Sequence, residues 1–386
     1  MVDPTGYGVK KIAIVVCAWP PYAGGIPQNA FGQAVNLSRL GYQVTVFTPN
    51  YGQEKIQPPG FTVKFLYTPF KFGLAAFVPQ LFWHLRKFEL VHFYYPFYGA
   101  VKPIISLKVF CPKIKLVVHH EMEAVGRGFK KIFFKLHAKL FLPWVVRLAD
   151  KIIVLSEDYA LNCELAGYYQ KFRSKFIAIG NGVTCEKFQP GTKDLTLLNK
   201  LSLTLSDKIL LFVGGLDTQH YFKGVEILLT ALKQLKAPAK LLIVGEGNLK
   251  NSYQAKAVAL GVDQQVVFVG QVANTALPKY YKLADIFVLP AVARTESFST
   301  ATAEAQSCGV PAVVSNLPGL RQTIIDGQTG LLFKVGDSFD LAEKLTKLLT
   351  DENRRRQLGQ AAAIRAQELF SWSKIIQQII AVYNSL

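Results

Sequence analysis

The chain has 386 residues, half of them hydrophobic, which suffices for two domains with separate cores and argues against a disordered chain. Its five cysteines are scattered and include no Cys-x-x-Cys pair, which excludes a disulfide framework and a cysteine zinc site and favours a reducing compartment. The net charge is +18, and residues 1–180, with 22 Lys and Arg against 9 Asp and Glu, hold +13 of it, which indicates nucleic acid or an anionic membrane surface as a partner.

The first apolar run, KIAIVV at 11–16, comes directly after Lys10 and resembles a signal peptide only weakly. A buried strand explains it better, because the glycine-rich turn that follows is typical of a strand–helix unit. No stretch approaches the roughly 20 apolar residues that span a bilayer. We therefore expect a cytoplasmic protein, soluble or peripheral on the inner face of the membrane.

Gly24 and Gly25 form the turn after this strand. Glycine lets the backbone approach a ligand closely, and the helix that follows offers free N–H groups to an anion. Gly25 is therefore a candidate binding residue, although an ordinary turn explains it equally well. The G-x-G-x-x-G fingerprint is absent, which argues against a nicotinamide oxidoreductase.

Short apolar runs, each followed by a segment with helical periodicity, continue along the chain. They are QVTVFT, ELVHFY, KLVVHH, KIIVLS and KFIAIG in the first half and KILLFVGG, KLLIVGEG, QVVFVG, DIFVLP and PAVVS in the second. Runs that are apolar throughout are typical of parallel strands covered by helices on both sides. We predict an α/β fold with two doubly wound, Rossmann-like parallel-sheet domains, whose ligand-binding edges face each other across a cleft.

The segment FKKIFFKLHAKLFL at 129–142 has helical periodicity and combines lysines with large apolar residues. These are Phe129, Lys130, Lys131, Ile132, Phe133, Lys135, Leu136, Lys139 and Leu140. A basic amphipathic helix of this kind suits an anionic membrane surface. The alternative, equally compatible with the sequence, is a helix whose apolar side lies in the core and whose lysines reach solvent.

Asn-Gly and Pro-Gly pairs cluster in IGNGVTCEKFQPGTKD at 179–194, which predicts a domain boundary. We assign residues 1–183 to the first domain and 184–370 to the second. The final segment, 371–386, has the pattern of a helix with no strand after it, and we expect it to pack back on the first domain.

In the second half, a strand ends in Gly214 and Gly215, and Lys223 and Gly224 open an amphipathic helix. A lysine at a helix start among glycines forms a natural phosphate site, because its charge adds to the positive end of the helix dipole. A solvated lysine is the alternative. The spacing of a Walker P-loop is absent.

The stretch RTESFSTATAE at 294–304 holds two glutamates, Glu296 and Glu304, eight positions apart. Ser297 or Ser299 is the expected N-cap of a helix over about 299–308. Glu296 then lies in the loop and Glu304 one turn inside the helix.

The first backbone N–H groups of this helix, at Phe298, Ser299 and Thr300, lie between the two carboxylates. Carboxylates accept hydrogen bonds from vicinal hydroxyls, and a helix start holds phosphates. The arrangement suits a ligand with hydroxyls at both ends and a diphosphate in the middle. The alternative is an ordinary solvated helix surface.

Taken together, four motifs resemble those of glycosyltransferase family 4, retaining enzymes with the two-domain GT-B fold. NGVTCEKFQP is similar to N-G-V-D-x-x-x-F-x-P, and VGGLDTQHYFKG to V-G-R-L…K-G. ESFSTATAEAQSCGVPAVVS resembles E-G-F-G-x-x-x-x-E-A-x-A-x-G-x-P-V, and DGQTGLLF the D-G-x-x-G-x-L that follows. The motifs occur in the family's order, and the resemblance covers nearly the whole chain.

The resemblance implies that Glu304 holds the ribose hydroxyls of a nucleotide-sugar and that Glu296 holds the transferred sugar. It implies that Lys223 neutralises the diphosphate leaving group. The expected donor-binding residues are Gly25, Gly215, Lys223, Arg294, Glu296, Phe298, Ser299, Thr300 and Glu304.

In the first domain, KLVVHHEMEA resembles the family's strand that ends in a histidine followed by an acid, matching His120 and Glu121. The resemblance implies that His120 contacts the sugar near the reacting carbon, while His119 faces the core. A structural histidine at a strand end is the alternative. With Glu296 and Lys223, His120 completes the expected catalytic set.

The chain departs from the family's pattern in two places. Gly215 stands where many members have an arginine that contacts the diphosphate, so phosphate binding must rest on Lys223 and backbone N–H groups, with Arg294 or His220 as further candidates. The other departure is E-S-F-S in place of E-G-F-G. Serine tolerates positive φ less well than glycine, so we expect a slightly different loop.

The resemblance implies a hexosyltransferase of class EC 2.4 that moves a sugar from a UDP- or GDP-sugar to an acceptor hydroxyl without a metal or other cofactor. With a membrane-binding helix, a lipid-linked saccharide in cell-envelope or extracellular polysaccharide synthesis is the expected acceptor. Two alternatives stay open: a nucleotide-sugar epimerase of the same fold, and a basic nucleic-acid-binding protein. No recognised nucleic-acid-binding motif is present, so we expect no nucleic-acid partner.

Overall fold

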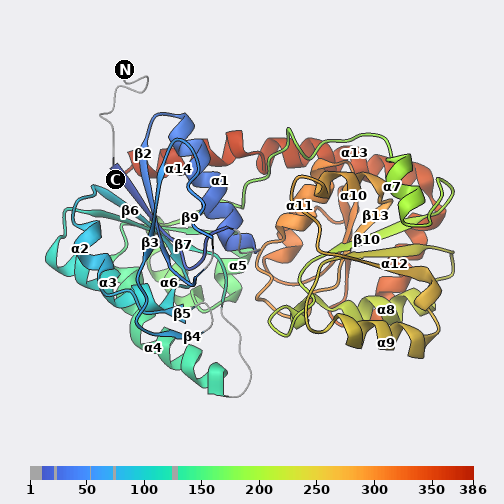
Figure 1. The fold of residues 1–386 in the computed structure, drawn as a ribbon, viewed down its shortest axis with the longest axis horizontal. Coiled ribbons are helices and arrows are strands. Elements are labelled where there is room, and N and C mark those ends of the chain that lie inside the picture. The colour runs from blue at the N-terminus through green and yellow to red at the C-terminus, as the bar shows by residue number, and fades with distance from the viewer. Residues whose placement is uncertain (1–10, 21–23, 53, 73–74, 124–128) are drawn as a thin grey trace. The chain divides into compact units, whose positions relative to one another are not determined.

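The computed structural model describes residues 11–20, 24–52, 54–72, 75–123 and 129–386. It divides the chain into two compact units (Figure 1). Unit 1 comprises Met1–Gly182 together with Trp372–Leu386, and unit 2 comprises Val183–Ser371. Each unit is built around one parallel sheet with helices on both faces, so the predicted pair of doubly wound α/β domains is confirmed.

Unit 1 has a seven-stranded sheet in the order β3-β2-β1-β6-β7-β8-β9, and every pairing is parallel. The strands are β1 (Lys11–Val15), β2 (Gln43–Pro49), β3 (Thr62–Leu66), β6 (Leu90–Tyr95), β7 (Lys115–His120), β8 (Lys151–Val154) and β9 (Phe176–Ala178). A separate antiparallel pair joins β4 (Lys71–Phe72) to β5 (Ala75–Ala76). All six residues of β6 are buried, as expected for a central strand covered on both faces.

The helices of unit 1 cover both faces of this sheet (Figure 1). They are α1 (Gly25–Arg39), α2 (Leu81–Leu85), α3 (Tyr98–Phe110), α4 (Phe129–Leu148), α5 (Glu157–Asn162), α6 (Ala166–Lys171), the 3-10 turn η1 (Arg173–Lys175) and α14 (Trp372–Asn384). Successive residues of β1 enter different cores: Ile12 and Ile14 pack with α1 and α14, whereas Ala13 and Val15 pack on the opposite face. Because successive side chains of a strand point to opposite faces, β1 contributes to the core on each side of the sheet.

Trp372, the first residue of the C-terminal helix α14, packs closely against unit 1. A Cβ atom added at Gly32 would lie 2.2 Å from the Trp372 ring, and one added at Gly182 would lie 2.4 Å from it. The indole therefore fits between α1 and the chain that leaves β9 only because both positions are glycine.

Unit 2 has a six-stranded parallel sheet in the order β12-β11-β10-β13-β14-β15. Its strands are β10 (Ile209–Val213), β11 (Lys240–Val244), β12 (Val266–Gly270), β13 (Ile286–Leu289), β14 (Ala312–Ser315) and β15 (Gly330–Phe333). Its helices are α7 (Leu195–Lys200), α8 (Val225–Gln234), α9 (Lys250–Leu260), α10 (Leu277–Leu283), α11 (Thr300–Ser307), α12 (Ser338–Thr350) and α13 (Glu352–Leu369), with 3-10 turns η2 (Tyr221–Lys223), η3 (Asp263–Gln265) and η4 (Leu320–Thr323).

Candidate functional site

The loop after β10 brings Lys223 against two glycines. A Cβ atom at Gly214 would lie 2.7 Å from Cδ of Lys223, so the lysine stem lies directly over this residue. Gly224, which precedes α8, has φ 75°, and a Cβ atom there would lie 1.9 Å from the carbonyl oxygen of Pro290. Glycine is required at position 224, whereas a side chain at position 214 would displace the Lys223 stem. The close packing fixes the place of Lys223 relative to β10 and β13.

The lysine forms an ion pair with one of the two predicted glutamates. Nζ of Lys223 donates to Oε2 of Glu296 at 2.8 Å, and the two side chains are 13% and 9% exposed. Glu296 follows β13 and Lys223 follows β10, and these two strands are neighbours in the sheet. Because the carboxyl ends of parallel strands meet at one edge, residues 73 positions apart in the chain come together there.

Helix α11 begins as the sequence predicts. Ser299 is its N-cap, and the serine hydroxyl accepts a hydrogen bond from the amide of Thr302 at 3.0 Å. The amides of Phe298, Ser299 and Thr300 donate no hydrogen bond to any residue that the structure describes. Donors of this kind at a helix start can bind an anion. Arg294 is exposed and lies in the same loop, two residues before Glu296.

Glu304 lies half-buried inside α11 and accepts a hydrogen bond from the Tyr281 hydroxyl at 2.7 Å. Burial raises the pKa of Glu304 to about 7, against the opposing effects of the Tyr281 hydrogen bond and the positive charge of Lys187. Near neutral pH this carboxyl therefore exists in both protonation states. Tyr281 and Lys187 are partners that the sequence did not indicate.

In unit 1, His120 ends β7 and is 1% exposed. Its ring stacks on Tyr95, with centroids 5.2 Å apart, and its Nε2 lies 3.2 Å from Oε1 of Glu164. Nδ1 of His120 is buried and has no hydrogen-bond partner in the described part of the chain. The contact between His120 and a sugar stays a prediction.

His119 lies in the core, as predicted, but His120 is equally buried. The His119 ring stacks on Tyr94 at 4.8 Å, and its Nδ1 lies 3.2 Å from Nε2 of His92. Burial, together with the nearby His120, lowers the pKa of His119 to about 3, so His119 is neutral in the physiological range. His119 therefore has a structural role.

The next residue, Glu121, has an environment that the sequence did not reveal. Its carboxylate accepts a hydrogen bond from Nδ2 of Asn29 at 2.7 Å and another from Nδ2 of Asn181 at 3.4 Å. Burial raises the pKa of Glu121 to about 7, although both hydrogen bonds lower it. Asn29 is on α1, one turn after Gly25, and Asn181 is the asparagine of the NGV motif. The motif asparagine was the available signal, but sequence alone did not identify its partner.

Gly25 begins α1, and a Cβ atom added there would meet no atom within 4 Å. Packing does not require glycine at this position, and there is room beside it. At Gly215 the situation is the reverse, because a Cβ atom would lie 2.7 Å from Nδ1 of His220. A side chain thus has room at position 25, whereas at position 215 it would collide with His220.

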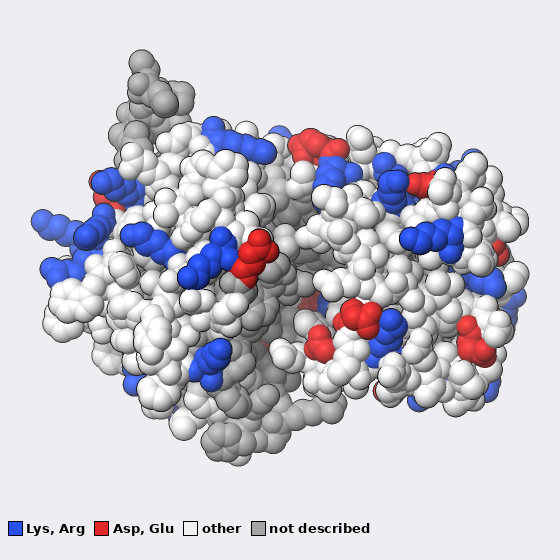
Figure 2. All heavy atoms as spheres, in the orientation of Figure 1, with Lys and Arg blue, Asp and Glu red and all other residues white. Residues whose placement is uncertain are grey.

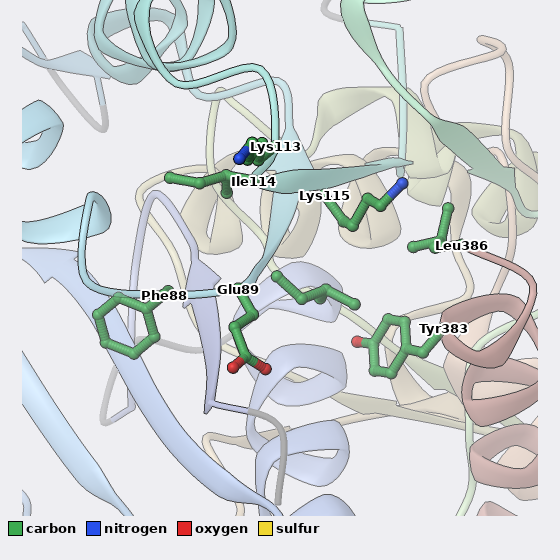
Figure 3. A pocket seen from close by; sticks show the side chains of 8 residues that line it. Phe88, Glu89, Lys113, Ile114, Lys115, Tyr383 and Leu386 are labelled. Atoms are coloured by element: carbon green, nitrogen blue, oxygen red, sulfur yellow. The ribbon is translucent and has the colours of Figure 1, made fainter. Parts of the chain in front are cut away.

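A cavity of about 380 Å³ in unit 1 lies away from these residues (Figure 3). Leu90 and Lys115, the first residues of β6 and β7, line it together with Tyr383 and Leu386 from the C-terminal segment. His120 is at the other end of β7, so the cavity lies at the opposite edge of the sheet from the predicted sugar-binding residues.

Comparison with known proteins identifies the family. The model described as Glycosyltransferase Family 4 matches residues 23–187, and that described as Glycosyl transferases group 1 matches 196–365. The D-inositol 3-phosphate glycosyltransferase of Corynebacterium diphtheriae is 30% identical over 392 residues, which cover 94% of this chain and 90% of that protein.

Two solved structures share the fold. Sucrose-phosphate synthase from Thermosynechococcus elongatus has a TM-score of 0.78 and 23% identity, covering 97% of this chain and 98% of the other. HepE from Anabaena, solved with UDP-glucose, has a TM-score of 0.79 and 19% identity, covering 98% and 100%. The two parallel sheets are thus those of GT-B enzymes, and the chain belongs to glycosyltransferase family 4.

Proposed function

We propose that the protein transfers a hexose from a UDP- or GDP-sugar to an acceptor hydroxyl with retention of the anomeric configuration. The observation that carries the proposal is the cluster in unit 2, where Lys223, Glu296 and the start of α11 meet at one sheet edge. A cation and open amides suit a diphosphate, while carboxylates suit hydroxyls. The UDP-glucose bound to HepE supports the same donor class.

The ion pair between Lys223 and Glu296 gives a physical role to each partner. An incoming diphosphate competes with Glu296 for the ammonium group of Lys223. Glu296 is thereby released to accept a hydrogen bond from a sugar hydroxyl. Lys223 and the amides of Phe298 and Ser299 then stabilise the negative charge that develops on the leaving diphosphate.

The nucleoside end of the donor is assigned to Glu304, whose carboxylate accepts hydrogen bonds from the ribose hydroxyls when it is ionised. In unit 1 we assign His120 to the transferred sugar near the reacting carbon and Gly25 to close backbone contact with the donor. No side-chain base is assigned to the acceptor hydroxyl, because the departing phosphate oxygen can take its proton on the same face. The reaction so assigned needs no metal.

A thermal-shift screen with UDP, GDP, ADP and their hexose conjugates tests the donor. At a ligand concentration of 100 Kd, binding stabilises the folded state by about 2.7 kcal/mol, which raises the melting temperature by roughly 5–10 °C. We expect one nucleoside diphosphate and its sugar to give such a shift. Absence of a shift with every ligand at millimolar concentration contradicts the proposal.

The epimerase alternative predicts another product. Incubation with the donor alone would then give a changed sugar and free nucleotide, whereas a transferase gives turnover that depends on an added acceptor. The second alternative, nucleic-acid binding, predicts a shift with DNA or RNA oligonucleotides that weakens steeply with salt.

We propose that helix α4 docks unit 1 on an anionic membrane and that the acceptor is lipid-linked. Four apolar side chains recur at every fourth position of this helix and are each more than half exposed. They are Ile132, Leu136, Leu140 and Trp144. On the other side of the helix, Phe134 stacks on Tyr98 at 5.2 Å. The alternative that the apolar side of this helix lies in the core therefore does not hold for these four residues.

The charge of unit 1 supports this partner. Lys135 and Lys139 are exposed on the same helix, while the side chains of Phe129, Lys130 and Lys131 lie outside the described residues. On the visible face of unit 1, basic side chains outnumber acidic ones (Figure 2). Basic side chains beside exposed apolar ones favour anionic lipid. No described helix is long and apolar enough to cross a membrane.

We expect the double substitution Leu136→Gln with Leu140→Gln to weaken co-sedimentation with vesicles of phosphatidylglycerol and phosphatidylcholine at least about 10-fold, since each buried leucine contributes roughly 1.5–3 kcal/mol. The control is Val258→Gln in unit 2, where an apolar side chain that is also more than half exposed lies outside α4. If the wild type does not bind the vesicles at low salt, the membrane assignment is wrong. It is also wrong if the double variant binds them as well as the wild type.

A further inference from the structure

The loop between Gly215 and Lys223 contains a histidine that the assigned roles leave unused. A Cβ atom at Gly215 would lie 2.7 Å from Nδ1 and 3.0 Å from Cγ of His220, so the imidazole fills the space that a side chain at position 215 would take. His220 lies in the turn that leads into η2, and its carbonyl accepts a hydrogen bond from the amide of Lys223 at 3.0 Å. The ring and the lysine stem thus lie over neighbouring glycines.

Asp217 fixes the direction of this ring. Its Oδ2 lies 2.8 Å from Nδ1 of His220, while its Oδ1 accepts hydrogen bonds from the amides of Gln219 at 2.7 Å and His220 at 3.2 Å. Burial acts to raise the pKa of Asp217, but the hydrogen bond and charge of His220 outweigh it and the pKa is lowered. An ionised Asp217 therefore accepts from Nδ1–H of His220, and this contact fixes the orientation of the ring.

The other ring nitrogen is open. Nε2 of His220 has no hydrogen-bond partner among the residues that the structure describes, and the side chain is 36% exposed. Lys223, by contrast, is already compensated by Glu296 at 2.8 Å. A diphosphate that binds here meets a lysine already paired with a carboxylate. A second positively charged donor in the same loop would therefore stabilise the bound diphosphate further.

We propose that His220 is a second cationic donor to the diphosphate, acting beside Lys223. The imidazole takes its second proton from solvent, keeps Nδ1–H on Asp217 and donates Nε2–H to a phosphate oxygen. The inference rests on the proposed function and specifies how the same site recognises its ligand. It gives the Asp217–His220 pair a role beyond closing the loop.

The test compares the affinity for a nucleoside diphosphate with that for the matched nucleoside. Calorimetry with UDP and uridine, or with GDP and guanosine if the protein prefers them, isolates the contribution of the diphosphate. We expect His220→Gln to weaken diphosphate binding about 10-fold and to leave nucleoside binding unchanged. His220→Lys restores a positive charge, and we expect it to regain most of the lost affinity.

The control is Lys233→Gln, which removes one exposed positive charge near the other end of α8 and should leave both affinities unchanged. Melting temperatures of all variants separate a loss of binding from a loss of folding. Equal weakening of diphosphate and nucleoside binding in His220→Gln, or a His220→Lys variant as weak as His220→Gln, overturns the inference and leaves the proposed function standing. If the wild type binds no nucleoside diphosphate, the proposed function itself fails.

Discussion

Replacing Glu296 by glutamine is expected to lower kcat about 100- to 1,000-fold, the effect of removing one preorganised polar group from a transition-state site. The same substitution should keep or tighten binding of the nucleoside diphosphate. The reason is the 2.8 Å pair with Lys223, because a neutral amide oxygen competes less strongly with the diphosphate for the ammonium group than a carboxylate does. Steady-state kinetics and calorimetry on one preparation measure the two effects.

The opposite signs of these effects make the prediction specific. A residue with only a structural role would lower activity and binding together. The control is Glu352→Gln, because Glu352 also pairs with a lysine of unit 2, Lys208, at 3.6 Å, but Lys208 lies just before the start of β10. That pair is at the other edge of the sheet, and we expect near-wild-type turnover. Near-wild-type turnover of Glu296→Gln contradicts the catalytic assignment.

Removal of the carboxylate also affects folding, in a way that distinguishes glutamine from alanine. Glu296→Gln leaves an oxygen that can accept from Lys223, whereas Glu296→Ala leaves a nearly buried ammonium group without its partner. Breaking a buried pair from one side costs about 3–5 kcal/mol, and less where water still reaches the group. Glutamine therefore separates the loss of chemistry from the loss of stability.

The strands that the sequence predicts are those whose residues are apolar throughout. β6 and β13 are buried at every position and correspond to ELVHFY and DIFVLP. The strands that the sequence did not predict were β3 and β15, each at one edge of its sheet, and the short antiparallel pair of β4 and β5. β3 alternates between exposed and buried residues, and β15 has four residues that follow a turn motif. Edge position alone does not explain the two misses, because the edge strands β9 and β12 were predicted from the runs KFIAIG and QVVFVG, which are almost wholly apolar.

The sequence did not predict which polar side chains pair with one another. An N-cap is a local feature, and a serine before a helical pattern was enough to limit it to Ser297 or Ser299, of which the structure has Ser299. The Glu121 contacts with Asn29 and Asn181 join positions 92 and 60 residues apart, and no local rule couples them. Topology explains why such groups converge at the carboxyl ends of strands, but which polar groups then pair depends on packing.

Replacing Glu304 by glutamine is expected to weaken nucleoside diphosphate binding about 10- to 100-fold at pH 8, the cost of losing charge-assisted hydrogen bonds to ribose hydroxyls. At pH 5.5 the wild-type carboxyl is mostly protonated, because its pKa is about 7, and the difference between the two proteins should shrink. Affinity of the wild type thus rises with pH through about 7, while that of the variant stays level. Calorimetry at four pH values between 5.5 and 8.5 measures both curves.

Without ligand, Glu304→Gln should be the more stable of the two proteins at high pH. The folded state raises the pKa of Glu304 from 4.5 to about 7, so it binds this proton more tightly than the unfolded chain does. The free energy of unfolding therefore falls as pH rises from about 4.5 to 7, by at most ~3 kcal/mol from this group. Glutamine removes that penalty, so Glu304→Gln should melt above the wild type at pH 8 and close to it at pH 5.

A carboxyl that destabilises the free protein at neutral pH but strengthens ligand binding has a specific explanation in this site. Tyr281 supplies one hydrogen bond, and the rest of the solvation that Glu304 lost on burial is left for the ligand to replace. A variant that binds the nucleoside diphosphate as tightly as the wild type at pH 8, while melting higher, would place the ribose elsewhere. In that case the raised pKa of Glu304 would reflect burial without a ligand to compensate it.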